Sequence, residues 1–99
     1  MRLTEAQAAR IAQLAGEIAG MAVEVRVFGS RLDDEAKGGD LDLLVEAAEP
    51  LPNPALLAAR LSAKVSRLMG GRKVDVLLSA PNLMRLPIHD VARRDGRRL

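Results

Sequence analysis

Hydrophobic and polar positions follow a helical period at the start of the chain and then a strand period. Thr4 and Gln7 have the spacing of a capping box that starts a helix, and Gly20 fits its end. The apolar face of this predicted helix is formed by Ile11, Leu14, Ala15, Ile18 and Ala22. Residues 23–28 (VEVRVF) alternate between apolar and other side chains, which predicts a strand.

The rest of the chain also alternates between strand and helix patterns. Residues 40–46 (DLDLLVE) predict a second strand, and residues 73–79 (KVDVLLS) predict a third. Between them, Asn53 and Pro54 form an N-cap and first-turn pair that opens a helix over 54–69. A short last helix is predicted from Pro87 to Arg94, with Gly96 as its cap.

This order of elements predicts one small domain over residues 1–99, of the α/β (α+β) class, with a sheet of three or four strands. Hydrophobic residues make up 48 % of the chain, which is enough for a core. A basic signal-peptide start, a membrane span and cysteine are all missing from the sequence, so we expect a cytoplasmic protein without membrane contact.

The aromatic content and the charge argue against a nucleic-acid binder. Phe28 is the single aromatic residue, so we do not expect recognition of single-stranded nucleic acid by base stacking to be the main activity. The net charge of +2 is too small to indicate binding to a phosphate backbone. His89, the single histidine, is interpreted as an ordinary residue of the last helix rather than a base or a ligand.

Three aspartates interrupt strands that otherwise read as buried. Asp40 and Asp42 are two residues apart, so on a strand both side chains leave the same face. Asp75 lies between Val74 and Val76 in the third strand. If the second and third strands are neighbours, these carboxylates converge, and a hard cation such as Mg²⁺ or Mn²⁺ would compensate their charge.

The Gly29-Ser30 turn after the first strand adds a candidate phosphate contact. Glycine lets the backbone approach a phosphate, and the serine hydroxyl and nearby amides donate hydrogen bonds. Each feature also has a plain structural reading: an ordinary turn for Gly-Ser, a cap for Asp40, and an ion pair with Arg72 or Lys73 for Asp75. The combination favours a site for a metal ion and a nucleotide.

With these motifs the chain resembles the minimal nucleotidyltransferases of the DNA polymerase β-like superfamily, in particular short bacterial MNT-type proteins that partner HEPN-domain toxins. The matching segments are VRVFGSR (25–31), GDLDLLVE (39–46), GRKVDVLLS (71–79) and, more loosely, IHDVARRDGRRL (88–99). The resemblance implies a small mixed sheet with helices packed mainly on one face.

The resemblance also implies roles for individual residues. Gly29 and Ser30 match the family's contacts to the triphosphate, and the adjacent Arg31 can touch phosphate. Asp40, Asp42 and Asp75 match its catalytic, metal-binding acids. The expected cofactor is Mg²⁺ or Mn²⁺, with ATP as the nucleotide substrate.

The expected activity is Mg²⁺-dependent transfer of AMP from ATP to a hydroxyl of a partner protein, a tyrosine of a HEPN-type toxin being the expected acceptor. In this interpretation the protein is an antitoxin that acts by AMPylation. The alternative is a non-catalytic antitoxin that neutralises its partner by binding alone. Transfer to RNA or to a small molecule is a weaker third interpretation, because 99 residues leave no obvious second domain to hold such an acceptor.

Overall fold

The first helix has the two ends that its sequence predicts. The computed structural model of the chain describes residues 3–28 and 41–99, and its first helix is α1 (Glu5–Ala19). Thr4 Oγ1 accepts a hydrogen bond from the Gln7 N–H, and Gln7 Oε1 accepts one from the Thr4 N–H, each at 3.0 Å. At the other end Gly20 has a φ of 71°, a left-handed conformation that favours glycine.

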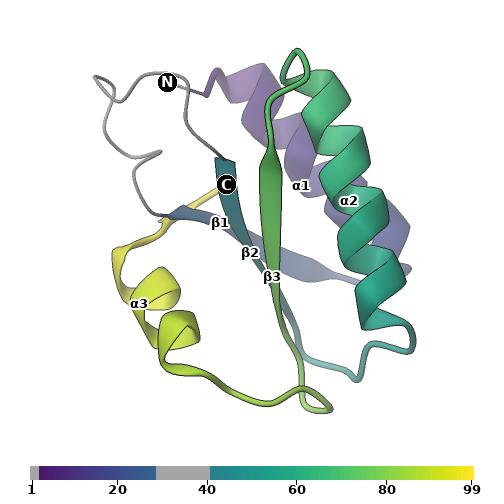
Figure 1. Cartoon of the computed structure of the whole chain (residues 1–99), viewed down its shortest axis with the longest axis vertical. Coiled ribbons are helices and arrows are strands. Elements are labelled where there is room, and N and C mark those ends of the chain that lie inside the picture. The colour runs from purple at the N-terminus through teal and green to yellow at the C-terminus, as the bar shows by residue number, and fades with distance from the viewer. Residues whose placement is uncertain (1–2, 29–40) are drawn as a thin grey trace.

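The remaining elements follow in the predicted order (Figure 1). They are β1 (Val23–Phe28), β2 (Leu41–Ala47), α2 (Pro54–Leu68), β3 (Val74–Ser79), α3 (Pro87–Asp95) and β4 (Arg97–Arg98). The α+β fold class is therefore confirmed. The two-residue strand β4 is an addition that the sequence did not predict, because a pair of arginines carries no strand signal.

The four strands form one mixed sheet in the order β3-β2-β1-β4. Strand β1 runs antiparallel to β2 and to β4, whereas β2 and β3 are parallel. The parallel pair requires a crossover connection, and α2 provides it. This topology brings the second and third predicted strands side by side, which is the arrangement on which convergence of the aspartates depends.

Helices α1 and α2 cover one face of the sheet, and the main core lies between these two layers. The alternate residues of β1 and β2 that point toward the helices are buried. The core cluster includes Ile11, Leu14 and Ala15 from α1, Leu61 and Val65 from α2, and Val25, Val27, Leu41, Leu43 and Val45 from the sheet. Burial of these aliphatic side chains is the main contribution to stability.

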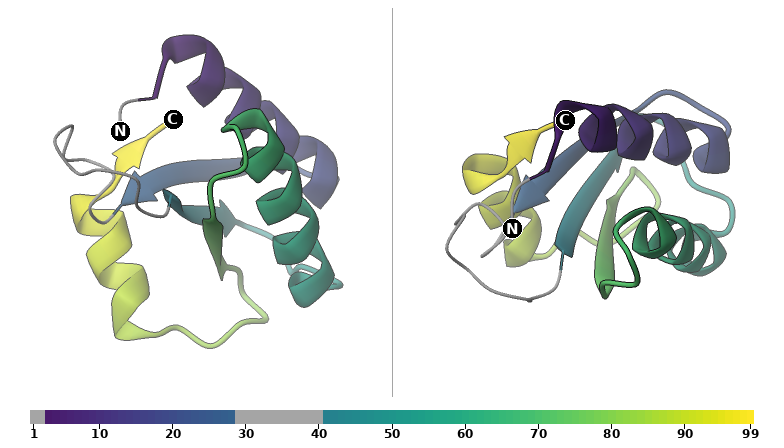
Figure 2. Two further views of the ribbon diagram at one scale, coloured as in Figure 1. Left: turned by 45° about the horizontal axis from the view of Figure 1, so that its top comes forward. Right: turned by 90° about the horizontal axis from the view of Figure 1, so that it is seen from above.

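Helix α3 packs against the opposite face of the sheet (Figure 2). Arg93 Nε donates a hydrogen bond of 2.8 Å to Glu46 of β2, and Glu46 also accepts one from Arg26 of β1 at 3.3 Å. Leu44 is completely buried on this side, as is Ala92 of α3. Helix α3 therefore covers part of this face around Leu44 and Glu46.

The start of α2 differs in one detail from the sequence prediction. The helix begins at Pro54 as predicted, but the side chain of Asn53 forms no capping hydrogen bond. Asn53 is exposed, so water can solvate its amide, and its backbone carbonyl accepts the Leu57 N–H at 2.9 Å.

No helix within residues 3–28 and 41–99 combines the length and the apolar character that crossing a membrane requires.

Candidate functional site

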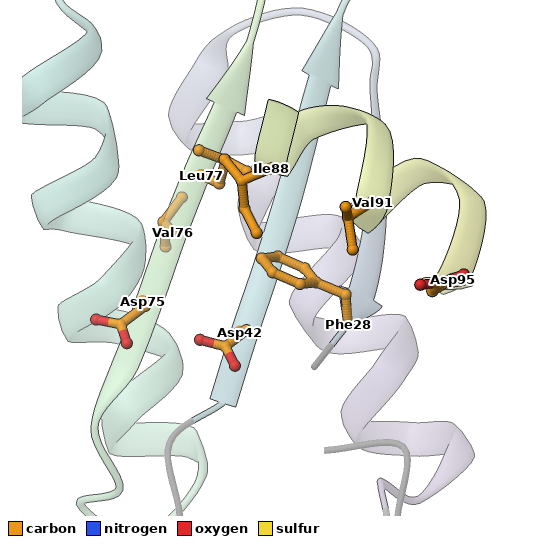
Figure 3. A pocket seen from close by; sticks show the side chains of 8 residues that line it. All are labelled: Phe28, Asp42, Asp75, Val76, Leu77, Ile88, Val91 and Asp95. Atoms are coloured by element: carbon orange, nitrogen blue, oxygen red, sulfur yellow. The ribbon is translucent and has the colours of Figure 1, made fainter. Parts of the chain in front are cut away.

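Asp42 and Asp75 lie directly opposite each other on the parallel strands β2 and β3. Phe28, the last residue of β1, is the partner of Asp42 on the other side. These three residues therefore form one row across the sheet, and Figure 3 shows both carboxyl groups pointing to the same side. The sequence-predicted adjacency of Asp42 and Asp75 is present in the fold.

The alternation along β2 explains why Asp42 points away from the main core. Leu41 and Leu43 are completely buried toward α1 and α2, so the residue between them faces the other side of the sheet. On that side Leu44 is buried near α3, whereas Asp42 is only half-buried. Asp42 thus lies on the helix α3 side of the sheet, two residues closer to the start of β2 than Leu44.

The Asp42 and Asp75 carboxylates are like charges on neighbouring strands. Neighbouring strands are about 4.8 Å apart, and like charges directly opposite each other destabilise a sheet. Asp75 is exposed and takes part in none of the ion pairs between described residues. The alternative in which Arg72 or Lys73 neutralises Asp75 is therefore not seen among those pairs.

A pocket of about 640 Å³ opens beside this pair. Asp42 and Asp75 line it together with Phe28, Val76 and Leu77 of the sheet. Ile88, Val91 and Asp95 of α3 form the facing wall (Figure 3). The pocket is thus largely apolar, with two adjacent carboxylates on one side.

Asp95, which also lines the pocket, has a different environment from Asp42 and Asp75. The Asp95 carboxylate accepts hydrogen bonds from Arg94 Nε at 3.1 Å and from Arg94 Nη2 at 3.4 Å. These hydrogen bonds, helped by the positive charge of Arg94, lower the pKa of Asp95 below its ordinary value. Asp95 is therefore an ionised carboxylate already paired with arginine, and in Figure 3 Phe28 stands between it and Asp42.

The described residues supply only part of the metal site that the sequence predicts. Within residues 3–28 and 41–99, no three His, Cys, Asp or Glu side chains gather closely enough to hold a metal ion. The predicted third acid, Asp40, lies outside the described residues, as do Gly29, Ser30 and Arg31. Asp42 and Asp75 provide the oxygen donors that a hard divalent ion prefers, and their roles stay a prediction.

Sequence reasoning did not assign Phe28, Ile88 or Val91 to the pocket. The alternation of β1 does place Phe28 on the side opposite Val25 and Val27, and this was the available signal. No comparable signal exists for Ile88 and Val91. They face the pocket because α3 packs on the sheet, and contacts of that packing, such as the one between Arg93 and Glu46, join residues 47 positions apart in the sequence.

The chain was compared with protein-family models and with curated proteins, and neither comparison gave a match.

Proposed function

We propose that this protein is a Mg²⁺-dependent nucleotidyltransferase that moves AMP from ATP to a hydroxyl group of a partner protein. The observation that carries the proposal is the juxtaposition of Asp42 and Asp75 on parallel strands, at one side of a 640 Å³ pocket. Pockets of roughly 300–1,000 Å³ are typical of small-molecule sites, and nucleotides are bound in sites of this kind.

The donor atoms fit a hard divalent cation. Two carboxylates on adjacent strands supply oxygen ligands, and Mg²⁺ is usually held in proteins by one or two carboxylates together with substrate phosphates. When bound, Mg²⁺ would supply stabilisation of the negative charge on the phosphates. In this proposal Asp40, Gly29 and Ser30 act as the family resemblance implies, as a third metal ligand and as contacts to the triphosphate.

The reaction transfers a nucleoside monophosphate. The acceptor oxygen forms a bond to the α-phosphorus, while the bond from that phosphorus to the bridging oxygen breaks and pyrophosphate leaves with the electron pair. The proton of the acceptor hydroxyl passes to the carboxylate of Asp75. Asp75 suits this role because it is exposed beside the pocket, where the side chain of another protein can reach it.

A HEPN-type toxin tyrosine is the acceptor that the family resemblance favours, and the protein would then be an antitoxin. A second function, neutralisation of the partner by binding alone, is supported by a different observation. Met84, Leu86, Ile88 and Val91 are large apolar side chains that are exposed on α3 and on the segment before it. Exposed apolar groups in one region are a feature of contact surfaces between proteins.

The test of the transferase is label transfer. The protein is incubated with Mg²⁺, ATP labelled at the α-phosphate and a HEPN-type protein encoded next to it. We expect label on the partner, no label in the presence of EDTA, and at least a hundredfold lower rate for Asp42→Asn, corresponding to about 2.7 kcal/mol in the barrier. Glu49→Gln, which removes an exposed acid beyond the other end of β2, is the matched control and should transfer at the wild-type rate.

The same experiment separates the two functions. If the wild-type protein transfers no label, and Asp42→Asn neutralises the partner as well as the wild type does, the transferase proposal is wrong and neutralisation by binding is favoured.

A further inference from the structure

The pocket has one polar side and a larger apolar part. Away from Asp42 and Asp75, the pocket is lined by the apolar residues Phe28, Val76, Leu77, Ile88 and Val91. The side chain of Val76 also packs against the main core. None of these five side chains carries a hydrogen-bond donor or acceptor. Figure 3 shows Phe28 between Asp42 and helix α3, with Ile88 above its ring.

This division matches the two halves of a nucleoside triphosphate. The phosphates require cations and polar groups, whereas the flat base is stabilised by stacking on an aromatic ring and by aliphatic contacts. Phe28 is the single aromatic residue of the chain, and the strand register places it beside Asp42. A nucleotide whose phosphates lie at the carboxylates would therefore have its base within reach of Phe28.

We infer that this apolar part of the pocket holds the nucleotide base and does not distinguish strongly between bases. The inference rests on the proposed function, and it goes further by naming the substrate class as nucleoside triphosphates in general. A site that hydrogen-bonds a substrate group rejects an analogue without that group by 10⁴–10⁵-fold, whereas an apolar pocket discriminates by only about 10–200-fold. The apolar walls belong to the second kind.

Apart from Asp42 and Asp75, Asp95 is the lining side chain that can accept a hydrogen bond from a base. Its carboxylate oxygens already accept both hydrogen bonds from Arg94, at 3.1 and 3.4 Å. Each oxygen keeps a further acceptor position. A base amino group held by Asp95 would therefore show as a strong preference for one base, which is among the results that would overturn the inference.

Calorimetric titration tests the inference without relying on turnover. Non-hydrolysable analogues of ATP, GTP, CTP and UTP are titrated with Mg²⁺ into the whole chain, and inorganic tripolyphosphate serves as the comparison without a base. We expect the four dissociation constants to lie within about tenfold of one another. Each analogue should bind at least tenfold more tightly than tripolyphosphate, because the base adds its own contacts.

Two variants locate the base. Phe28→Leu keeps an apolar side chain but removes the ring, and it should weaken all four analogues by about five- to a hundredfold while leaving tripolyphosphate unchanged. Ile88→Ala shortens an exposed wall residue of α3 and should weaken the analogues less. Met84→Ala, the control, removes a side chain that is 79 % exposed and lies outside the pocket lining, so it should leave the affinities for the analogues and for tripolyphosphate unchanged.

Four results would overturn the inference. A preference of more than two-hundredfold for one base would mean that polar groups read the base. Equal affinity for tripolyphosphate and the analogues, or full affinity in Phe28→Leu, would place the base outside this pocket while leaving the proposed transferase intact. If neither the analogues nor tripolyphosphate bind, both the inference and the proposed function are wrong.

Discussion

Asp42 and Asp75 place two carboxylates side by side on neighbouring strands. Both are on strands, where aspartate is disfavoured, and the parallel register places them directly opposite each other. The next pair on the same face of these strands is Leu44 and Leu77. Apolar side chains therefore fit this face of the sheet, and the packing of the sheet does not itself require carboxylates at positions 42 and 75. In the proposed function, a bound cation would offset the repulsion between the two carboxylates.

This reasoning predicts that Asp75→Asn stabilises the protein when no divalent metal is present. The substitution removes one of two like charges that face each other, and we expect a gain of about 0.2–1 kcal/mol in the free energy of unfolding in EDTA. Urea denaturation followed by circular dichroism measures the gain. Saturating Mg²⁺ should stabilise the wild type by its binding free energy and reduce or reverse the difference.

Glu49→Gln, which removes an exposed acid remote from the pair, is the control and should change stability little in either buffer. A clear loss of stability for Asp75→Asn in EDTA would show that the Asp75 carboxylate has a stabilising partner, and would contradict the interpretation.

At the scale of elements, the attachment of α3 determines whether the pocket has a second wall. His89, which is 3 % exposed, connects this helix to β3. Its Nδ1 accepts the Leu86 N–H at 2.8 Å, so in the neutral ring the proton is on Nε2, which donates to the Leu78 carbonyl at 2.8 Å. His89 is thus a buried structural residue that joins α3 to β3.

Replacing His89 by Phe should therefore weaken the attachment of α3. The aromatic ring is kept, but the Leu86 N–H and the Leu78 carbonyl both lose their partner, at a cost of about 1–3 kcal/mol for each group that stays buried. Chemical denaturation gives the total loss, and amide hydrogen exchange should show it concentrated in α3. Unchanged stability together with unchanged exchange in α3 would contradict this assignment.

Gly96 connects α3 to β4 at a point where a side chain does not fit. A Cβ atom at this position would lie 2.2 Å from the carbonyl oxygen of Ala92 and 3.2 Å from that of Val27. Since backbone must move to accommodate it, Gly96→Ala should lower stability by more than about 1 kcal/mol. The measurement is the midpoint of thermal unfolding.

Gly16→Ala is the matched control because it should have the opposite sign. Gly16 lies inside α1, and outside the backbone of that helix its added Cβ would come no closer than 3.8 Å to another atom, the Met21 carbonyl oxygen, which is an ordinary contact. Alanine is favoured over glycine in a helix by about 0.5–1 kcal/mol, so this variant should be more stable than the wild type. Equal effects of the two substitutions would show that the close approach at Gly96 has no influence.

At the scale of the whole molecule, the local patterns of the sequence predicted most of the fold. Periods of 3.6 and 2 residues, together with caps such as Thr4, located three helices and three strands. These features depend only on neighbouring residues, and a sequence displays them directly.

The features that the sequence did not predict depend on contacts between distant segments. Strand β4 exists because Arg97 and Arg98 pair with β1, about 70 positions earlier, and not because of their own strand propensity. The apolar wall of the pocket likewise follows from the packing of α3 on a face of the sheet. Exposed side chains such as Ile88 and Val91 give no sign of this in the local pattern.

Paramagnetic broadening by Mn²⁺ tests most directly whether Asp42 and Asp75 bind a cation with a nucleotide. Amide signals are recorded for the whole chain while Mn²⁺ is added together with a non-hydrolysable ATP analogue. The signals of residues 41–43 and 74–76 should lose intensity at the lowest Mn²⁺ concentration, with those around Glu49 unaffected, and Asp42→Asn should abolish the effect. Broadening that begins elsewhere, for example at Asp90 and Asp95 of α3, while residues 41–43 and 74–76 keep their intensity, would contradict the account.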